Sequence, residues 1–128
     1  MGNIYGAQNV ASYFVYELND IYSFVNSDSL QYLLAEVENK WHEHFGHSAF
    51  EEEVYALETG YVVKEVYEAY LSNGLDHISL PAKEFYLPYG TFQLIERTYG
   101  VPAFTPEEQV IIHSIIDQYR QVVLKQVS

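Results

Sequence analysis

Three histidines and four glutamates fall between residues 42 and 53, and these side chains have the clearest potential for chemistry. Imidazole and carboxylate groups are the usual protein ligands of zinc and iron. The spacing is unfavourable, because His42 and His44 diverge on a helix and Gly46 replaces the second histidine of an H-E-x-x-H zinc motif. His44 and His47 could converge only if the helix continued past Gly46. We therefore expect no metal and no cofactor, and a metal-dependent enzyme is kept as the third alternative.

The other chemically capable residues are scattered. The acidic run Glu51-Glu52-Glu53 could hold a hard cation, but consecutive acids are more typical of a solvated surface or a helix start. His77 and His113 are isolated, which favours structural roles. The chain has no G-x-S-x-G or S-x-x-K motif for a nucleophile and no glycine-rich phosphate loop. The sequence therefore predicts a protein that is not an enzyme.

Charge and composition limit the partners. Eighteen acids against six bases give 128 residues a net charge of −12, which opposes binding to nucleic acid and to anionic lipid. Fourteen of the acids lie between Glu17 and Glu84, so one face or end is expected to be strongly negative, unless the acids serve only solubility. There is no cysteine, no signal-peptide pattern and no apolar run near the ~20 residues of a membrane span. We expect a cytoplasmic, soluble protein.

Tyrosine is abundant, with thirteen residues in the chain. Its side chain offers a large, rigid contact area with a hydrogen-bonding tip, and it is enriched at the energetic centres of protein interfaces. In a small helical domain some of these rings must also belong to the core. The combination of acids and tyrosines favours a surface that binds another protein.

The helices that must position these residues can be predicted from caps and periodicity. A first helix should start near Asn3 or Gly6 and end around Ser23. A second should start at the polar segment 26–28 and end at Gly46, since glycine readily takes the left-handed conformation after a last turn. Their apolar stripes are Val10, Phe14, Leu18 and Ile21 in the first, and Leu30, Leu33, Leu34, Val37, Trp41 and Phe45 in the second.

The middle of the chain is less regular. Residues 50–59 fit either a short helix or an extended segment leading to Gly60, whose flexibility suits a turn or the close approach of another chain. Helical periodicity returns after Gly60 and ends at Asn73-Gly74. From residue 75 to 88 two extended pieces or a small β-hairpin are expected, and Thr91 to Tyr99 can form a short helix.

The last helix has the strongest start signal. Thr105-Pro106-Glu107-Glu108 combines an N-cap, a first-turn proline and a capping-box glutamate. Its expected buried stripe is Ile111, Ile112, Ile115, Ile116, Tyr119, Val122 and Val123. With no repeat or linker in the sequence, we predict a mainly α, single-domain bundle of five or six helices over residues 1–128.

The segment from Leu30 to Gly74 carries a family resemblance. Its motifs are Leu30-Gln31-x-Leu33-Leu34, Trp41-His42, Gly46, Phe50-x-Glu52-Glu53-Val54-Tyr55-Ala56 and Gly60-x-Val62-Val63-x-x-Val66-Tyr67, preceded by Ala7-x-x-Val10-Ala11-x-Tyr13. In this order they resemble the Panacea domain family, whose members are typically small bacterial and phage antitoxins or proteolysis adaptors. Tyr61 stands where the family's Gly-Pro-Val turn has proline, and Tyr32 where a lysine commonly follows Leu-Gln.

The resemblance implies a helical domain that neutralises a protein toxin by direct binding, or hands a client to a protease, without chemistry of its own. The expected partner is a basic toxin or an enzyme acting on nucleic acid, in a bacterial cell or a phage-infected host. The alternative is an acidic phage inhibitor that mimics DNA to block a host defence nuclease, as anti-restriction or anti-CRISPR proteins do. The residues expected to contact the partner are Glu51, Glu52, Glu53, Tyr55, Gly60, Tyr61, Lys64 and Glu65.

Overall fold

The computed structural model describes residues 2–56, 58, 61–86, 90 and 95–127. This part of the chain contains four α-helices, one short 3₁₀ helix and one antiparallel pair of strands. The elements are α1 (Ala7–Asp20), α2 (Ser27–Phe45), α3 (Lys64–Ala69), η2 (Leu71–Asn73), β1 (Lys83–Tyr86), β2 (Ile95–Thr98) and α4 (Pro106–Val127). The prediction of a mainly α fold is confirmed, although these residues hold four α-helices instead of five or six.

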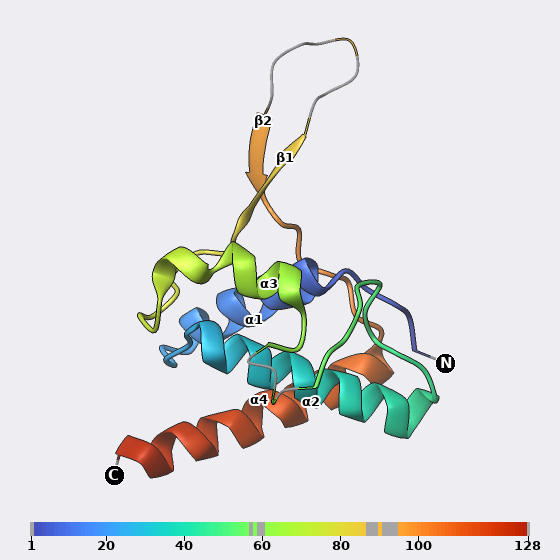
Figure 1. Cartoon of the computed structure of the whole chain (residues 1–128). Coiled ribbons are helices and arrows are strands. Elements are labelled where there is room, and N and C mark those ends of the chain that lie inside the picture. Colours follow the sequence, from blue (N-terminus) through green and yellow to red (C-terminus); the bar gives the residue numbers. More distant parts are fainter. Residues whose placement is uncertain (1, 57, 59–60, 87–89, 91–94, 128) are drawn as a thin grey trace.

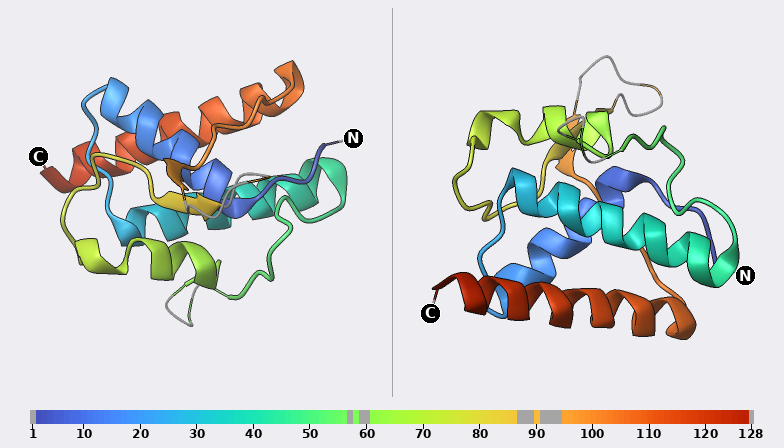
Figure 2. Two further views of the ribbon diagram at one scale, coloured as in Figure 1. Left: turned by 90° about the horizontal axis from the view of Figure 1, so that it is seen from above. Right: turned by 60° about the horizontal axis from the view of Figure 1, so that its bottom comes forward.

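The helices stack with α1 and α2 between α3 on one side and α4 on the other (Figure 1). The two further views in Figure 2 show the same order, with α4 running along the outside of the α1 and α2 pair. The strands β1 and β2 project from the helical body as a two-stranded ribbon (Figure 1). Tyr70 Oη accepts a hydrogen bond of 2.8 Å from the amide of Ala82, and this contact fixes the base of the ribbon against the end of α3.

The predicted boundaries of the second helix are confirmed by its caps, whereas the first helix begins after Gly6 as predicted but ends at Asp20, before Ser23. The Asn26 side chain accepts a hydrogen bond of 2.8 Å from the amide of Ser29 at the start of α2. Gly46 ends α2 with a φ of 77°, in the left-handed region that glycine tolerates best. The helix α1 begins after Gly6 without a side-chain cap of its own, and a distant residue supplies one instead, as described below.

The start of α4 is a capping box, as predicted. The amide of Glu108 donates to Thr105 Oγ1 at 3.2 Å, and the amide of Thr105 donates to Glu108 Oε1 at 2.9 Å. The same carboxylate, fully buried, also accepts hydrogen bonds from the amide of Asn3 at 2.7 Å and from Tyr5 Oη at 2.5 Å. Glu108 therefore joins the N-terminal segment to the first turn of the last helix.

One cluster of buried apolar side chains joins all four helices. Trp41, fully buried on α2, is among its largest members and donates through Nε1 to the carbonyl of Asn3 at 2.9 Å. The N-terminal segment continues by pairing in parallel with residues near Phe50, where Tyr5 N donates to Ala49 O at 2.8 Å. The segment after α2 is thus extended around Phe50, which resolves part of the ambiguity left by the sequence.

Several sequence predictions are wrong. The expected helix from Thr91 to Tyr99 is instead strand β2 over Ile95–Thr98, paired with β1 in the register Lys83↔Thr98 to Tyr86↔Ile95, while residues 91–94 lie outside the described part. Only the first of the two paired strands, Lys83–Tyr86, lies within the range 75–88 in which a hairpin was expected. The third helix is shorter than expected, and Val122, expected in the buried stripe of α4, is 40% exposed.

Candidate functional site

The histidines near the end of α2 make separate contacts with neighbouring residues. His42 is exposed and pairs with Glu38 on the same helix at 3.0 Å. His47 stacks against Phe45 with ring centroids 6.1 Å apart, and its Nδ1 contacts the carbonyl of Ser48 at 2.8 Å. Within the described ranges, no group of three or more His, Asp or Glu side chains is arranged to hold a metal ion.

His77 has a structural position. Its Nδ1 accepts from the amide of Val25 at 3.1 Å, so its Nε2 carries the proton and contacts Asn19 Oδ1 at 2.8 Å. Asn19 in turn donates to the carbonyls of Val15 and Ile78. The network ties the segment after η2 to the C-terminal end of α1.

The most distinctive surface feature is a cluster of three partly exposed tyrosines, which we call the tyrosine cluster: Tyr55, Tyr61 and Tyr67. The rings of Tyr55 and Tyr61 meet edge to face with centroids 5.3 Å apart, and those of Tyr61 and Tyr67 lie 5.5 Å apart. Tyr55 and Tyr61 come close because the amide of Tyr55 donates to the carbonyl of Val62 at 2.8 Å. Three segments separated in sequence thus place aromatic faces side by side.

Acidic side chains lie beside Tyr55 of the tyrosine cluster. Glu53 accepts a hydrogen bond from Tyr55 Oη at 3.1 Å, and this bond, together with the negative charge of Glu53, raises the pKa of the Tyr55 phenol. Lys64 lies 3.9 Å from Glu68 in an exposed pair, so its charge is already partly offset. The exposed glutamates of this region are Glu51, Glu53, Glu58, Glu65 and Glu68. The surface therefore presents aromatic rings beside a clear excess of carboxylates.

The expected contact residues separate into two groups. Tyr55, Tyr61 and Glu53 are directly linked by contacts, and the exposed Lys64 and Glu65 lie in the first turn of α3 near them. Glu52 instead accepts from the amide of Ala7 at 2.9 Å and so supplies the missing cap of α1. The exposed Glu51 adjoins the paired N-terminal segment through its amide, which donates to Tyr5 O at 3.0 Å, and Gly60 lies outside the described residues.

Gln31 holds the tyrosine-bearing segment in place. This buried glutamine of α2 accepts through Oε1 from the amides of Val62 and Val63 at 2.6 and 3.1 Å. Its Nε2 donates to the carbonyl of Val63 at 3.4 Å. The Leu-Gln pair at the start of α2 is thereby explained, because the glutamine satisfies two backbone amides that would otherwise be buried without acceptors.

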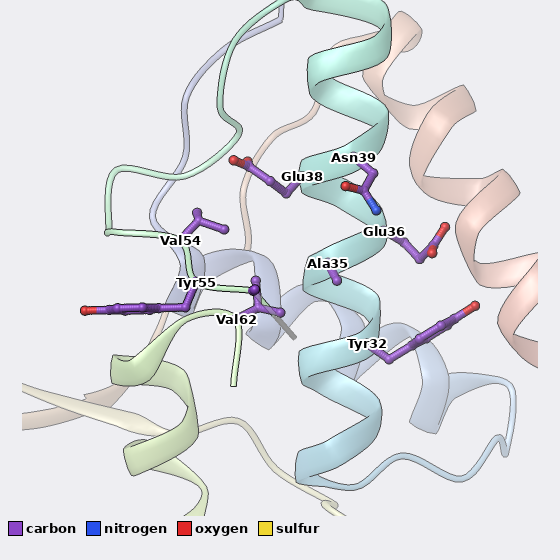
Figure 3. A pocket seen from close by; sticks show the side chains of 9 residues that line it. Tyr32, Ala35, Glu36, Glu38, Asn39, Val54, Tyr55 and Val62 are labelled. Carbon is purple, nitrogen blue, oxygen red and sulfur yellow. The ribbon is translucent and has the colours of Figure 1, made fainter. Parts of the chain in front are cut away.

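A groove of about 230 Å³ lies beside the tyrosine cluster, between α2 and the residues Val54, Tyr55, Ala56 and Val62. Ala35 leaves space on the side of α2 that faces Val54 and Val62, while Tyr32 and Glu36 extend from the same helix at the far rim (Figure 3). Tyr55 belongs both to the lining of this groove and to the tyrosine cluster. The lining residues are Tyr32, Ala35, Glu36, Glu38, Asn39, Val54, Tyr55, Ala56 and Val62.

A second, more open hollow of about 340 Å³ lies near the end of α1. It is lined by Asn19, Tyr22, Ser23, Phe24 and His77. Tyr22 is 97% exposed there and has a φ of 56°, which is uncommon for a residue other than glycine. Because the polar groups of Asn19 and His77 are used in the network described above, this hollow offers mainly aromatic surface.

Sequence reasoning missed Tyr67 and the outer side of the groove. Tyr67 was part of the motif Val66-Tyr67 but had no visible relation to Tyr61, since their contact depends on how residues 61–63 enter α3. The groove residues Tyr32, Glu36 and Asn39 follow helical spacing on α2, so a face of mixed aromatic and polar residues could have been found from periodicity.

The chain is a mainly α-helical domain with an aromatic and acidic surface. Over the residues that the structure describes, none of the helices combines the length and the apolar character needed to cross a membrane. Comparison with protein families, with curated proteins and with solved structures finds no match to this chain. A functional proposal must therefore be built on the residues themselves.

Proposed function

We propose that this chain is a non-enzymatic, antitoxin-like binding module that neutralises a basic protein toxin by covering its surface, or presents a client to a protease. The observation that carries the proposal is the tyrosine cluster among exposed glutamates. Aromatic rings held in contact lose little conformational freedom on binding, and such rings commonly provide the energetic centre of an interface. The surrounding carboxylates would accelerate encounter with a positively charged partner.

The resemblance to the Panacea family supports the same role, because its typical members act as antitoxins or proteolysis adaptors. Two residues that carry the resemblance have clear tasks here: Gln31 anchors Val62 and Val63, and Tyr67 contacts the ring of Tyr61, which stands where the family has proline. In this proposal the protein works in the cytoplasm of a bacterial cell or of a phage-infected host.

Co-expression with the product of the adjacent gene tests the proposal. If that product is toxic, growth should be restored by this chain and lost again when Tyr55, Tyr61 and Tyr67 are all replaced by serine. The matched control is Tyr22→Ser, which removes a highly exposed tyrosine from the other hollow and should leave neutralisation intact. Equal killing with and without the chain, at equal toxin levels, would refute the proposal.

A further inference from the structure

We infer that the groove lined by α2 together with Val54, Tyr55 and Val62 is a binding site for one arginine side chain of the partner. The inference rests on the proposed function and deepens it, since it assigns a specific anchor to the partner. The groove adjoins the tyrosine cluster, because Tyr55 belongs to both. If one residue of the partner contacts the cluster, an arginine near that residue in the partner can enter the groove.

The size and lining of the groove fit a long side chain with an apolar stem. Its volume of about 230 Å³ is below the ~300–1,000 Å³ of typical small-molecule pockets, which favours a single side chain over a cofactor. Ala35, Val54 and Val62 provide an apolar floor for methylene groups. Val62 is held against α2 by the hydrogen bond from its amide to Gln31, so this wall is fixed before binding.

Some polar side chains of the groove already have hydrogen-bond partners, and others do not. Glu38 is occupied, because its carboxylate accepts from Ser48 Oγ and from the amide of Ala49 and also contacts His42. The side chains of Glu36 and Asn39 make no hydrogen bond or ion pair within the described part of the chain. An incoming cation would therefore meet one carboxylate and one amide that have no competing internal partner.

A guanidinium group suits this end of the groove better than an ammonium group. Tyr32 lies beside Glu36, and burial together with the charge of Glu36 raises the pKa of the Tyr32 phenol. A planar guanidinium can stack on an aromatic ring while donating two parallel hydrogen bonds to a carboxylate, whereas an ammonium is a strongly hydrated point charge. Tyr32 and Glu36 provide the two surfaces that such a group uses.

The test is an NMR titration of the whole ¹⁵N-labelled chain with N-acetyl-arginine N-methylamide. Saturable shifts are expected at the amides of Ala35, Glu36 and Val62. The isosteric but uncharged N-acetyl-citrulline N-methylamide should bind about tenfold more weakly, and the lysine analogue about threefold more weakly. If the citrulline or the lysine analogue bound as tightly as the arginine analogue, the assignment of the groove to an arginine side chain would be overturned.

Three variants localise the binding. Ala35→Leu fills the floor and should abolish the saturable shifts, and Glu36→Gln should weaken binding about threefold to tenfold. Glu43→Gln removes an exposed carboxylate of the same helix outside the groove and should change nothing. Circular dichroism verifies that each variant keeps its helices. The inference would be overturned if the shifts were spread over all acidic residues and were the same in Ala35→Leu and Glu36→Gln as in the unaltered chain. Such a result would show only a general attraction between opposite charges.

The outcomes for the groove and for the proposed function can be separated. If Ala35→Leu and Glu36→Gln neutralise a toxin as well as the unaltered chain does, while the serine variants of the tyrosine cluster fail, the groove inference is wrong and the function stands. If the unaltered chain neutralises no toxin, the proposed function fails, and the titration still decides whether the groove selects a guanidinium group.

Discussion

Replacing Glu108 by alanine is expected to lower the free energy of unfolding by about 3 kcal/mol. The carboxylate is fully buried and accepts from the amides of Asn3 and Thr105 and from Tyr5 Oη, so its removal leaves three donors without their partner. Glu108→Gln should cost less, because its amide oxygen can still accept from Tyr5 and Thr105. Urea denaturation measured by circular dichroism provides the comparison.

Lowering the pH should also reduce the stability that the Glu108 carboxylate provides. Burial alone would raise the pKa of Glu108, but hydrogen bonds from Tyr5, Thr105 and Asn3 outweigh it and hold the pKa below its ordinary value. A carboxyl with a depressed folded-state pKa stabilises the fold fully above its unfolded pKa, and this stabilisation is lost as the pH falls through the folded value. The unaltered protein should therefore lose stability on acidification more steeply than Glu108→Gln. Parallel pH dependence in the two proteins would contradict the assigned role.

Replacing Gln31 by leucine is expected to lower the free energy of unfolding by about 2–4 kcal/mol. The change leaves the buried amides of Val62 and Val63 without an acceptor, although the volume at position 31 hardly changes. It should also release residues 61–63 from α2 and so weaken the interface that Tyr61 forms. Both effects follow from a single hydrogen-bonded anchor.

The matched control for this change is Gln118→Leu on the exposed side of α4. It makes the same chemical substitution where no buried amide depends on the side chain, so stability should change by less than about 0.5 kcal/mol. Amide hydrogen exchange at Val62 and Val63 should accelerate in Gln31→Leu only. Unchanged exchange at these two residues would show that the glutamine does not anchor the segment.

The helices whose ends are fixed by local chemistry could be predicted from the sequence. Asn26 and Gly46 bound α2, and Thr105 with Glu108 starts α4, because each of these signals acts within one turn of the helix. The cap of α1 could not be found in this way. Glu52, the residue that provides it, lies forty-five positions away from Ala7.

The errors in the prediction arise where a distant partner decides the conformation. The helix expected over Thr91–Tyr99 rested on the spacing of Phe92, Leu94 and Ile95, but pairing with β1 makes Ile95–Thr98 a strand. The third helix is shortened to Lys64–Ala69, since Gln31 fixes the backbone immediately before it and Tyr70 turns to meet Ala82. Local periodicity contains no information about these contacts.

The candidate site was predictable in composition but not in arrangement. The acids and tyrosines between residues 51 and 65 suggested an interaction surface, and Glu53, Tyr55 and Tyr61 do lie together. The sequence could not show that Glu52 caps a helix or that Tyr67 completes the cluster. These roles depend on where residues 46–56 and 61–63 lie against the rest of the fold.

The most direct test of the binding role is the dissociation constant of the purified complex with the neutralised toxin, measured between about 0.1 M and about 1 M salt. With aromatic anchors, we predict that affinity falls by about tenfold or less over this range, and that serine at Tyr55, Tyr61 and Tyr67 weakens binding by about 100-fold or more. The account would be contradicted if the affinity fell steeply with salt and did not change when the three tyrosines are replaced. That result would indicate a DNA-mimic inhibitor instead.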